Sequence, residues 1–197
     1  YGQSMSTAYR RSFGNIPSFD SFDNLAIPFR AIATDLATSQ AVVLDRGDLL
    51  IAMKASATVP GALVPVKIGD KYLVDGGMAE NLPVKQLQLM GADIIIAVDI
   101  SAPLLESEDI RNAFSVLEQI SSFLTVRTID SAKELLGEDD YYIRPDVDHL
   151  GTRDFDKMEE SFAAGKVSAE QQLQGLRKLS IAPEQYQLYQ QQKRAKL

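Results

Sequence analysis

The sequence predicts an α/β fold of three layers, α/β/α, in which helices cover both faces of a mostly parallel central sheet. Two observations predict this class. Short runs of apolar and β-branched residues alternate along the chain with longer segments of helical period. One of these runs, 94–98 (IIIAV), is apolar on both faces, as is typical of a parallel strand that helices cover on both sides.

The first elements are expected between residues 29 and 61. Residues 29–36 are rich in apolar and β-branched side chains and predict a strand, and 41–44 predict a short strand that forms a hairpin with it. Asp48 then stands where a helix N-cap is expected, before side chains of helical period. The sequence Val-Pro-Gly at 59–61 ends that helix.

A second hairpin and a helix follow. Residues 66–68 and 71–74 are expected to be strands, because the intervening Gly-Asp pair at 69–70 is a two-residue hairpin signal. Pro83 fits the first turn of a helix that ends at Gly91.

The C-terminal part is expected to be mainly helical. Apolar residues between 110 and 124 follow a 3.6-residue period, which predicts a long helix or helix pair ended by Gly137. Residues 141–144 predict another strand. Asp154 is placed to cap a further helix, whose buried face is expected to carry Phe155, Met158, Phe162 and Ala169.

Composition excludes several classes. The 197 residues suffice for one domain with a core, and the net charge of −7 argues against a nucleic-acid partner, which would require a basic surface. The chain has no cysteine, so disulfides and thiolate metal sites are excluded. It contains neither a cleavable signal peptide nor an apolar stretch long enough to span a bilayer. Because the chain starts at Tyr1, we expect the natural N-terminus to lie upstream.

The strongest candidate for chemistry is Asp75, which ends an apolar strand and is followed by Gly76 and Gly77. Glycines allow a sharp turn, permit positive φ and leave room for a second segment or a substrate. A carboxylate held in such a turn can act as a general base toward a nearby hydroxyl. The alternative is purely structural, because Asp-Gly is a common turn dipeptide.

Other polar residues have structural explanations that compete with functional ones. Asp35 and Asp99 both end strands, where we favour structural turns over a place in the substrate cleft. Glu80 and Asn81 follow the glycine turn and could reach the site, although helix capping explains Asn81 equally well. His149 is the only histidine, and its polar loop favours a solvent-facing residue over a metal ligand.

Several ordered blocks resemble the bacterial patatin-like phospholipase family, and the resemblance extends from residue 27 to about residue 155. The blocks are PFRAIATD at 28–35, GDL at 47–49, ASATVPG at 55–61, VDGG at 74–77, NLPV at 81–84, and GAD at 91–93 running into VD at 98–99. A set of blocks in the right order is far more specific than any one of them. The resemblance implies that residues 1–180 are the C-terminal portion of a patatin-like domain, with 181–197 a terminal helix or linker.

In that family a Ser-Asp dyad hydrolyses acyl esters of phospholipids without histidine. The resemblance implies that Asp75 is the dyad acid and that Gly76 and Gly77 form the active-site turn. The glycine-rich oxyanion loop and the Gly-x-Ser-x-Gly elbow of the family are absent from the sequence, so the serine is expected outside this chain. We place no nucleophile on Ser4 or Ser6, because their surroundings lack the closing glycine and a preceding apolar strand.

The resulting expectation is part of a lipid acyl hydrolase, a phospholipase A or esterase, with no metal or organic cofactor. Expected partners are a phospholipid or other acyl-ester substrate, a membrane surface, the N-terminal half of the domain and a second copy in a homodimer. The chain alone is expected to be inactive. The alternative is a lipid-binding or scaffold domain of the same fold without catalysis. A nucleotide-binding domain is a distant third, because no phosphate-binding glycine loop occurs.

The resemblance leaves the compartment open. The C-terminal segment resembles the end of the patatin domain in secreted bacterial lipases that are fused to an outer-membrane barrel. Export with outer-membrane anchoring, the bacterial cytoplasm and association with a membrane therefore all stay open.

Overall fold

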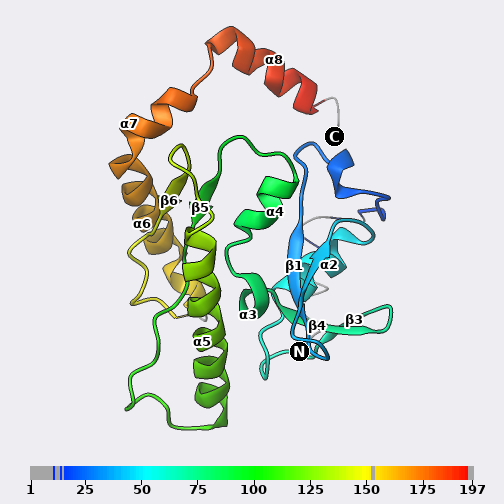
Figure 1. Cartoon of the computed structure of the whole chain (residues 1–197), viewed down its shortest axis with the longest axis vertical. Helices are drawn as coiled ribbons and strands as arrows, with labels where there is room; N and C mark the ends of the chain where they lie inside the picture. Colours follow the sequence, from blue (N-terminus) through cyan, green and yellow to red (C-terminus); the bar gives the residue numbers. More distant parts are fainter. Residues whose placement is uncertain (1–10, 12–13, 15, 152–153, 195–197) are drawn as a thin grey trace.

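Two separate β-sheets, one of four strands and one of two, organise the chain (Figure 1). The computed structural model describes residues 11, 14, 16–151 and 154–194. Every neighbouring pair in the larger sheet is antiparallel, and its strand order is β2 (Ala41–Leu44), β1 (Ala31–Asp35), β4 (Lys71–Asp75) and β3 (Val66–Ile68). The smaller sheet pairs β5 (Ile96–Val98) in parallel with β6 (Tyr141–Ile143).

The local signals of the N-terminal half produce the predicted elements. β1 and β2 form the expected hairpin, and so do β3 and β4, where Gly69 adopts a φ of 63° in the turn. Helix α2 (Leu49–Ser56) begins where predicted, because the Asp48 side chain accepts a hydrogen bond from the Ile51 amide at 3.0 Å. The next helices are α3 (Gly77–Glu80) and α4 (Val84–Leu89).

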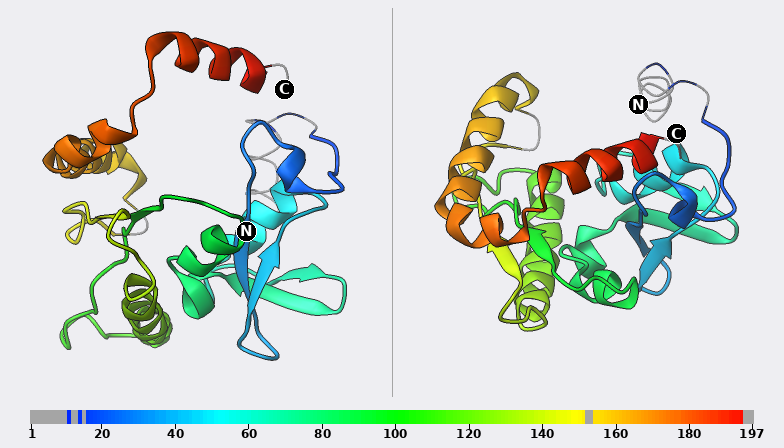
Figure 2. Two further views of the ribbon diagram at one scale, coloured as in Figure 1. Left: turned by 45° about the horizontal axis from the view of Figure 1, so that its top comes forward. Right: turned by 90° about the horizontal axis from the view of Figure 1, so that it is seen from above.

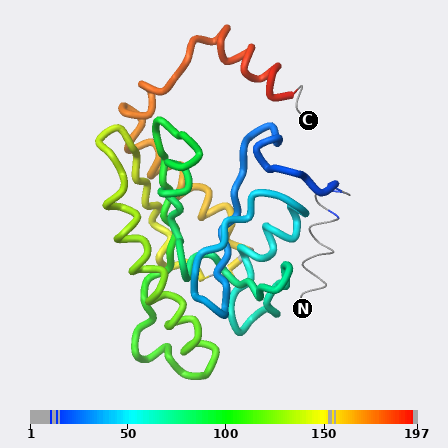
Figure 3. Tube along the Cα trace, turned by 45° about the vertical axis from the view of Figure 1, so that its right-hand side comes forward, coloured from blue at the N-terminus to red at the C-terminus, as the bar shows by residue number. Residues whose placement is uncertain are grey.

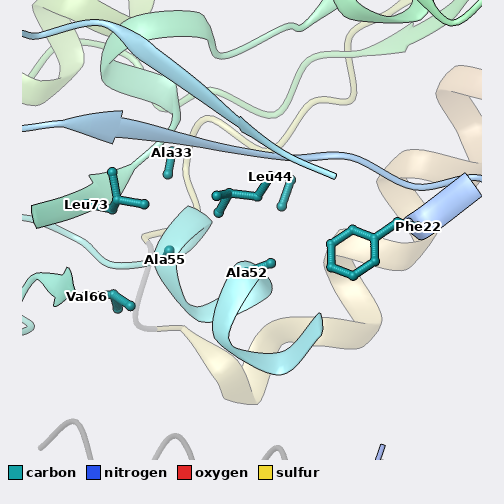
Figure 4. Packing of buried hydrophobic residues seen from close by; sticks show 8 residues of the cluster. Phe22, Ala33, Leu44, Ala52, Ala55, Val66 and Leu73 are labelled. Carbon is teal, nitrogen blue, oxygen red and sulfur yellow. The ribbon is translucent and has the colours of Figure 1, made fainter. Parts of the chain in front are cut away.

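The first core lies between α2 and the larger sheet. Figure 4 shows Ala52 and Ala55 of α2 directed toward Ala33, Leu44 and Leu73 of the strands. A short 3-10 helix, η1 (Phe22–Asn24), adds the fully buried ring of Phe22 at one end of this cluster. Small alanine side chains allow α2 to approach the sheet closely, which fixes the C-terminal end of α2 beside the end of β4.

A second core joins α4, the smaller sheet and the long helix α5 (Ala113–Lys133). Its members are buried apolar side chains from these elements and from the residues just before α4 and β5: Leu82, Val84, Ile95, Ala97, Ile129 and Ala132. Asn112 caps α5, because its side chain accepts hydrogen bonds from the Phe114 and Ser115 amides. Figure 2 shows α3 and α4 between α5 on one side and the larger sheet on the other.

The remaining elements form a helical C-terminal part. They are η2 (Phe155–Lys157), α6 (Met158–Gln171), α7 (Leu173–Leu176), η3 (Arg177–Leu179) and α8 (Pro183–Arg194). Helix α8 has no buried residue and projects from the end of α7 in Figures 1 and 3. None of the described helices is sufficiently long and apolar to cross a bilayer. The domain boundary after residue 180 stays a prediction.

The α/β class is confirmed, but the expected mostly parallel sheet is wrong for the described strands, since only β5 and β6 run parallel. The four-stranded sheet is antiparallel because it consists of two hairpins, and the segment 45–65, which contains α2, brings the second hairpin back so that β4 runs antiparallel to β1. The expectation that helices cover both faces of 94–98 is also wrong. Ile96 and Val98 are 46% and 50% exposed, whereas Ile95 and Ala97 are buried against α5, so one face of this strand is covered and the other is not.

The predicted buried face of the helix after Asp154 is wrong for two of its large residues, whereas Ala169 is half-buried. Met158 and Phe162 are exposed, the latter to 78%. The inward side of α6 carries small residues instead, and one of them, Ser168, donates a hydrogen bond to the Arg144 carbonyl. The larger apolar residues Met158, Phe162 and Val167 face outward.

Candidate active site

Asp75 is the last residue of β4, and its backbone is fixed by two neighbouring segments. Its amide donates to the Thr58 carbonyl at 2.9 Å, just beyond the end of α2. Its carbonyl accepts a hydrogen bond from the Thr34 hydroxyl of β1 at 2.7 Å. Thr34 and Thr58 are both buried, so the strand end is held in a defined position before the chain turns into α3.

The two oxygens of the Asp75 carboxylate have different surroundings. Oδ1 accepts a hydrogen bond from the Gly77 amide at 2.8 Å, which closes the turn. Oδ2 has no hydrogen-bond partner within the part of the chain that the structure describes. Burial raises the pKa of Asp75, and the hydrogen bond from Gly77 opposes that rise. One oxygen is therefore anchored while the other is available to a second group.

Gly76 and Gly77 are required for close approach rather than for positive φ. Neither has a positive φ, and that of Gly76 is −67°, so the expectation about positive φ was wrong. A Cβ on Gly76 would lie 2.1 Å from the carbonyl oxygen of Ile32 in β1. The expected room for a second chain segment is thus real at Gly76, where β1 passes directly against the turn.

Asp75 borders a cavity of about 470 Å³. The wall includes residues of β1, the C-terminal end of α2 and the glycine turn, and it carries both apolar and polar side chains. Glu80 and Asn81 line the same cavity, as their position after the turn predicted. A cavity of this size is in the range that holds small organic ligands.

Helix α5 supports the turn from the other side, and no local signal in the sequence indicates this. The Thr125 hydroxyl donates to the Gly77 carbonyl at 3.2 Å. The Thr128 hydroxyl accepts from the Asn81 amide at 3.3 Å and donates to the Thr125 carbonyl at 2.9 Å. These contacts span 47 to 48 positions along the chain, which sequence periodicity alone does not reveal.

Asp35 is used structurally. Its carboxylate accepts hydrogen bonds from the Ala37 amide and the Thr38 hydroxyl and forms an ion pair with Lys71 at 3.1 Å. The Ala37 amide and the Lys71 ammonium lower the pKa of Asp35, against the effect of burial. Each side-chain oxygen therefore has a partner in the turn or on the neighbouring strand, as expected for a structural turn.

Asp99 is also used structurally. It is 3% exposed, and although burial raises its pKa, hydrogen bonds from Tyr142 and Ser101 and the charge of Arg144 lower it below the usual range. These partners account for both carboxylate oxygens at the end of β5. The favoured interpretation of Asp99 as a turn residue agrees with these contacts.

His149 lies in an exposed position and contacts Glu160 of α6, with 2.7 Å between Nε2 and Oε1. No group of three His, Cys, Asp or Glu side chains arranged to hold a metal is found among the residues that the structure describes. Ser4 and Ser6, to which no nucleophile was assigned, lie outside the described residues.

Comparison with known proteins places this site in a family context. Residues 3–87 match the family model of patatin-like phospholipases, and the matched range includes Asp75 and both glycines. This match confirms the predicted resemblance to patatin-like phospholipases, while the bacterial type and the fusion to an outer-membrane barrel stay predictions.

The similar proteins that were found agree with it. An uncharacterized NTE family protein of Mycobacterium tuberculosis is 30% identical over 118 residues, which are 58% of this chain and 33% of that protein. A lysophospholipase of Meyerozyma guilliermondii is 23% identical over 187 residues, covering 83% of this chain and 13% of that protein. Patatin-like phospholipase domain-containing protein 7 of Mus musculus is 27% identical over 188 residues, covering 81% of this chain and 14% of that protein. The chain thus spans a third or less of the length of these relatives.

Proposed function

We propose that this chain is part of a serine-dependent lipid acyl hydrolase, in which Asp75 is the acid of a Ser-Asp dyad. The observation that carries the proposal is the state of the Asp75 carboxylate. One oxygen is fixed by the Gly77 amide, the other has no partner among the described residues, and the group borders a cavity. The matched family range around it supports assigning this arrangement to hydrolysis rather than to a simple turn.

The serine is proposed to come from polypeptide outside residues 1–197, because the sequence contains no Gly-x-Ser-x-Gly. Its hydroxyl oxygen attacks the ester carbonyl carbon while Asp75 accepts the hydroxyl proton. The tetrahedral intermediate collapses, the carbonyl re-forms, and the alcohol leaves with the proton from Asp75. Water then attacks the acyl-enzyme, Asp75 takes one proton from it, and the serine recovers a proton as the fatty acid leaves.

The local environment suits Asp75 to this exchange of protons. Burial raises its pKa toward the working pH, which makes the carboxylate a better base than a solvent-exposed one. The hydrogen bond from the Gly77 amide opposes this rise in pKa and fixes the orientation of the carboxylate. The route needs no metal or organic cofactor.

The substrate class is proposed from the relatives. One of them is named a lysophospholipase and another a patatin-like phospholipase domain-containing protein, so we propose a glycerophospholipid or lysophospholipid ester. Contact with a membrane surface and assembly as a homodimer remain further proposals of the same kind. A patatin-fold lipid-binding or scaffold domain is the second candidate, and the absence of a serine elbow from this sequence is what favours it.

The test uses the protein that contains this chain together with its upstream sequence. We expect release of fatty acid from a lysophospholipid and labelling of one serine by a fluorophosphonate, located by mass spectrometry outside residues 1–197. The isolated chain is expected to release none. Asp75→Asn should lower kcat by roughly 10²–10⁴-fold, the usual contribution of general acid–base catalysis.

The matched control is Asp70→Asn, which makes the same change on the exposed turn before β4. It should leave kcat unchanged. Near-normal turnover by Asp75→Asn would remove Asp75 from the mechanism. A protein that binds phospholipid vesicles without turnover or serine labelling would support the scaffold alternative instead.

A further inference from the structure

The turn that follows Asp75 cannot be stable by itself. Helix α3 contains four residues, a single turn, and has no side-chain hydrogen bond at its N-cap. An isolated helix this short is unstable in water, because the free-energy cost of nucleating a helix exceeds the stabilisation from the hydrogen bonds of one turn. The amide that anchors the Asp75 carboxylate belongs to the first residue of this helix, Gly77. The orientation of the carboxylate therefore depends on whatever holds α3.

Two threonines of α5 hold α3 at both ends. At the start, the Thr125 hydroxyl donates to the Gly77 carbonyl at 3.2 Å. At the end, the Thr128 hydroxyl accepts from the Asn81 amide at 3.3 Å. A second contact of Thr128 with the Gly77 carbonyl is longer, 3.5 Å, and competes with its 2.9 Å bond to the Thr125 carbonyl for one proton. Thr125 is thus the better donor to Gly77.

Helix α5 is itself well anchored and can act as a rigid support. Its N-terminus has a capping box formed by Asn112 and Ser115. Near its C-terminus, Ile129 and Ala132 are buried in the second hydrophobic core. A hydroxyl on such a helix has a defined position, so it can fix the peptide to which it binds.

We propose that Thr125, assisted by Thr128, is a positioning residue for Asp75, acting through Gly77. Thr125 binds the carbonyl of the peptide that follows Gly77, and the helical backbone of Gly77 relates that peptide to the preceding one, whose amide donates to Oδ1. Oδ2 stays available at the edge of the cavity that Asp75 borders. The inference rests on the proposed dyad role of Asp75. It adds α5, which lies outside the matched family range of residues 3–87, to the machinery of the site.

The variants are Thr125→Val and Thr128→Val, which keep the shape of the side chain and remove the hydroxyl, with Thr125→Ser as the rescue. Ser131→Ala is the control, because that hydroxyl lies on α5 and, among the described residues, bonds only to the Arg127 carbonyl of its own helix. Turnover is measured per active site, counted by fluorophosphonate titration, so that loss of folded protein does not enter kcat.

We expect Thr125→Val to lower kcat about tenfold, the rate equivalent of one net hydrogen bond, with KM within about twofold. The acidic limb of its kcat profile should move to higher pH, because the Gly77 amide stabilises ionised Asp75. Thr128→Val should have a smaller effect in the same direction. Thr125→Ser should recover most of kcat, and Ser131→Ala should match the unaltered protein.

A second measurement does not depend on turnover. The Asp75 carboxyl carbon is titrated by ¹³C NMR in protein labelled at aspartate, with its signal assigned by its loss in Asp75→Asn. Its midpoint should move upward in Thr125→Val and stay in place in Ser131→Ala. An unchanged midpoint overturns the positioning role whether or not the protein is active. If the midpoint shifts but the protein shows no turnover, or turnover that does not depend on serine, the proposed hydrolase is overturned. The positioning role of Thr125 is then still supported by the shifted midpoint.

Discussion

Replacement of Gly76 by alanine tests the packing of the turn most directly. The new Cβ would lie 2.1 Å from the carbonyl oxygen and 2.6 Å from the carbonyl carbon of Ile32. Both are backbone atoms of β1, which lies between β2 and β4 in the sheet, so no side-chain rotation relieves the overlap. Overpacking in a core costs about 1–3 kcal/mol, and for a backbone obstacle we expect about 3 kcal/mol of lost unfolding free energy.

Gly77→Ala and Gly165→Ala are matched controls. At Gly77 the nearest atom is Oδ1 of Asn81, at 2.7 Å, which is the end of a side chain that can turn away. At Gly165, within α6, no atom lies within 4 Å of the new Cβ. Alanine is favoured over glycine in a helix by up to about 1 kcal/mol, so both controls should be neutral or slightly stabilised.

Urea unfolding followed by circular dichroism measures these differences, and thermal unfolding should show the Gly76 variant melting roughly 6–12 °C lower. The reasoning is refuted if the Gly76 and Gly77 variants have the same unfolding free energy, because β1 would then not press against the turn.

Two further predictions concern pH. Burial raises the pKa of Asp75, so its contribution to stability is full below the unfolded value of 3.8 and is lost as pH rises through the raised pKa. Asp75→Asn should therefore gain unfolding free energy relative to the unaltered protein as pH increases; urea titrations at acidic and neutral pH measure this, and a constant difference would contradict it. Asp99 has the opposite sign, because its lowered pKa gives stability that is present above 3.8 and lost as pH falls through the folded value. Asp99→Asn should lose about 1–3 kcal/mol at neutral pH, with the deficit shrinking in acid, and stability equal to the unaltered protein at pH 7 would count against the Tyr142 contact.

The sequence was most informative where neighbouring residues decide the structure. Both hairpins and the helix that Asp48 caps lie where predicted, since turn glycines and capping side chains act within a few residues. The expectation of a mostly parallel sheet was wrong, although the two hairpins were expected. The apolar pattern of a strand indicates that the strand is buried or half-buried. Which strand lies beside it depends on connections between distant segments.

The faces of the C-terminal elements were also beyond local prediction. Phe162 belongs to a stretch of helical period, so its hydrophobicity predicted that it faces inward, whereas in the structure it is exposed. In the structure the contact with the smaller sheet is made by small residues such as Ser168.

For the site itself, the chain order alone determined that a carboxylate ends a strand and is followed by two glycines, because Asp75, Gly76 and Gly77 are consecutive. Only the tertiary structure decided how that carboxylate is held. Its supports come from β1, from the residues after α2 and from Thr125 on α5, the last 50 positions away. Such contacts form when separate elements pack together, and packing at long sequence separation leaves no local periodic signal in the sequence.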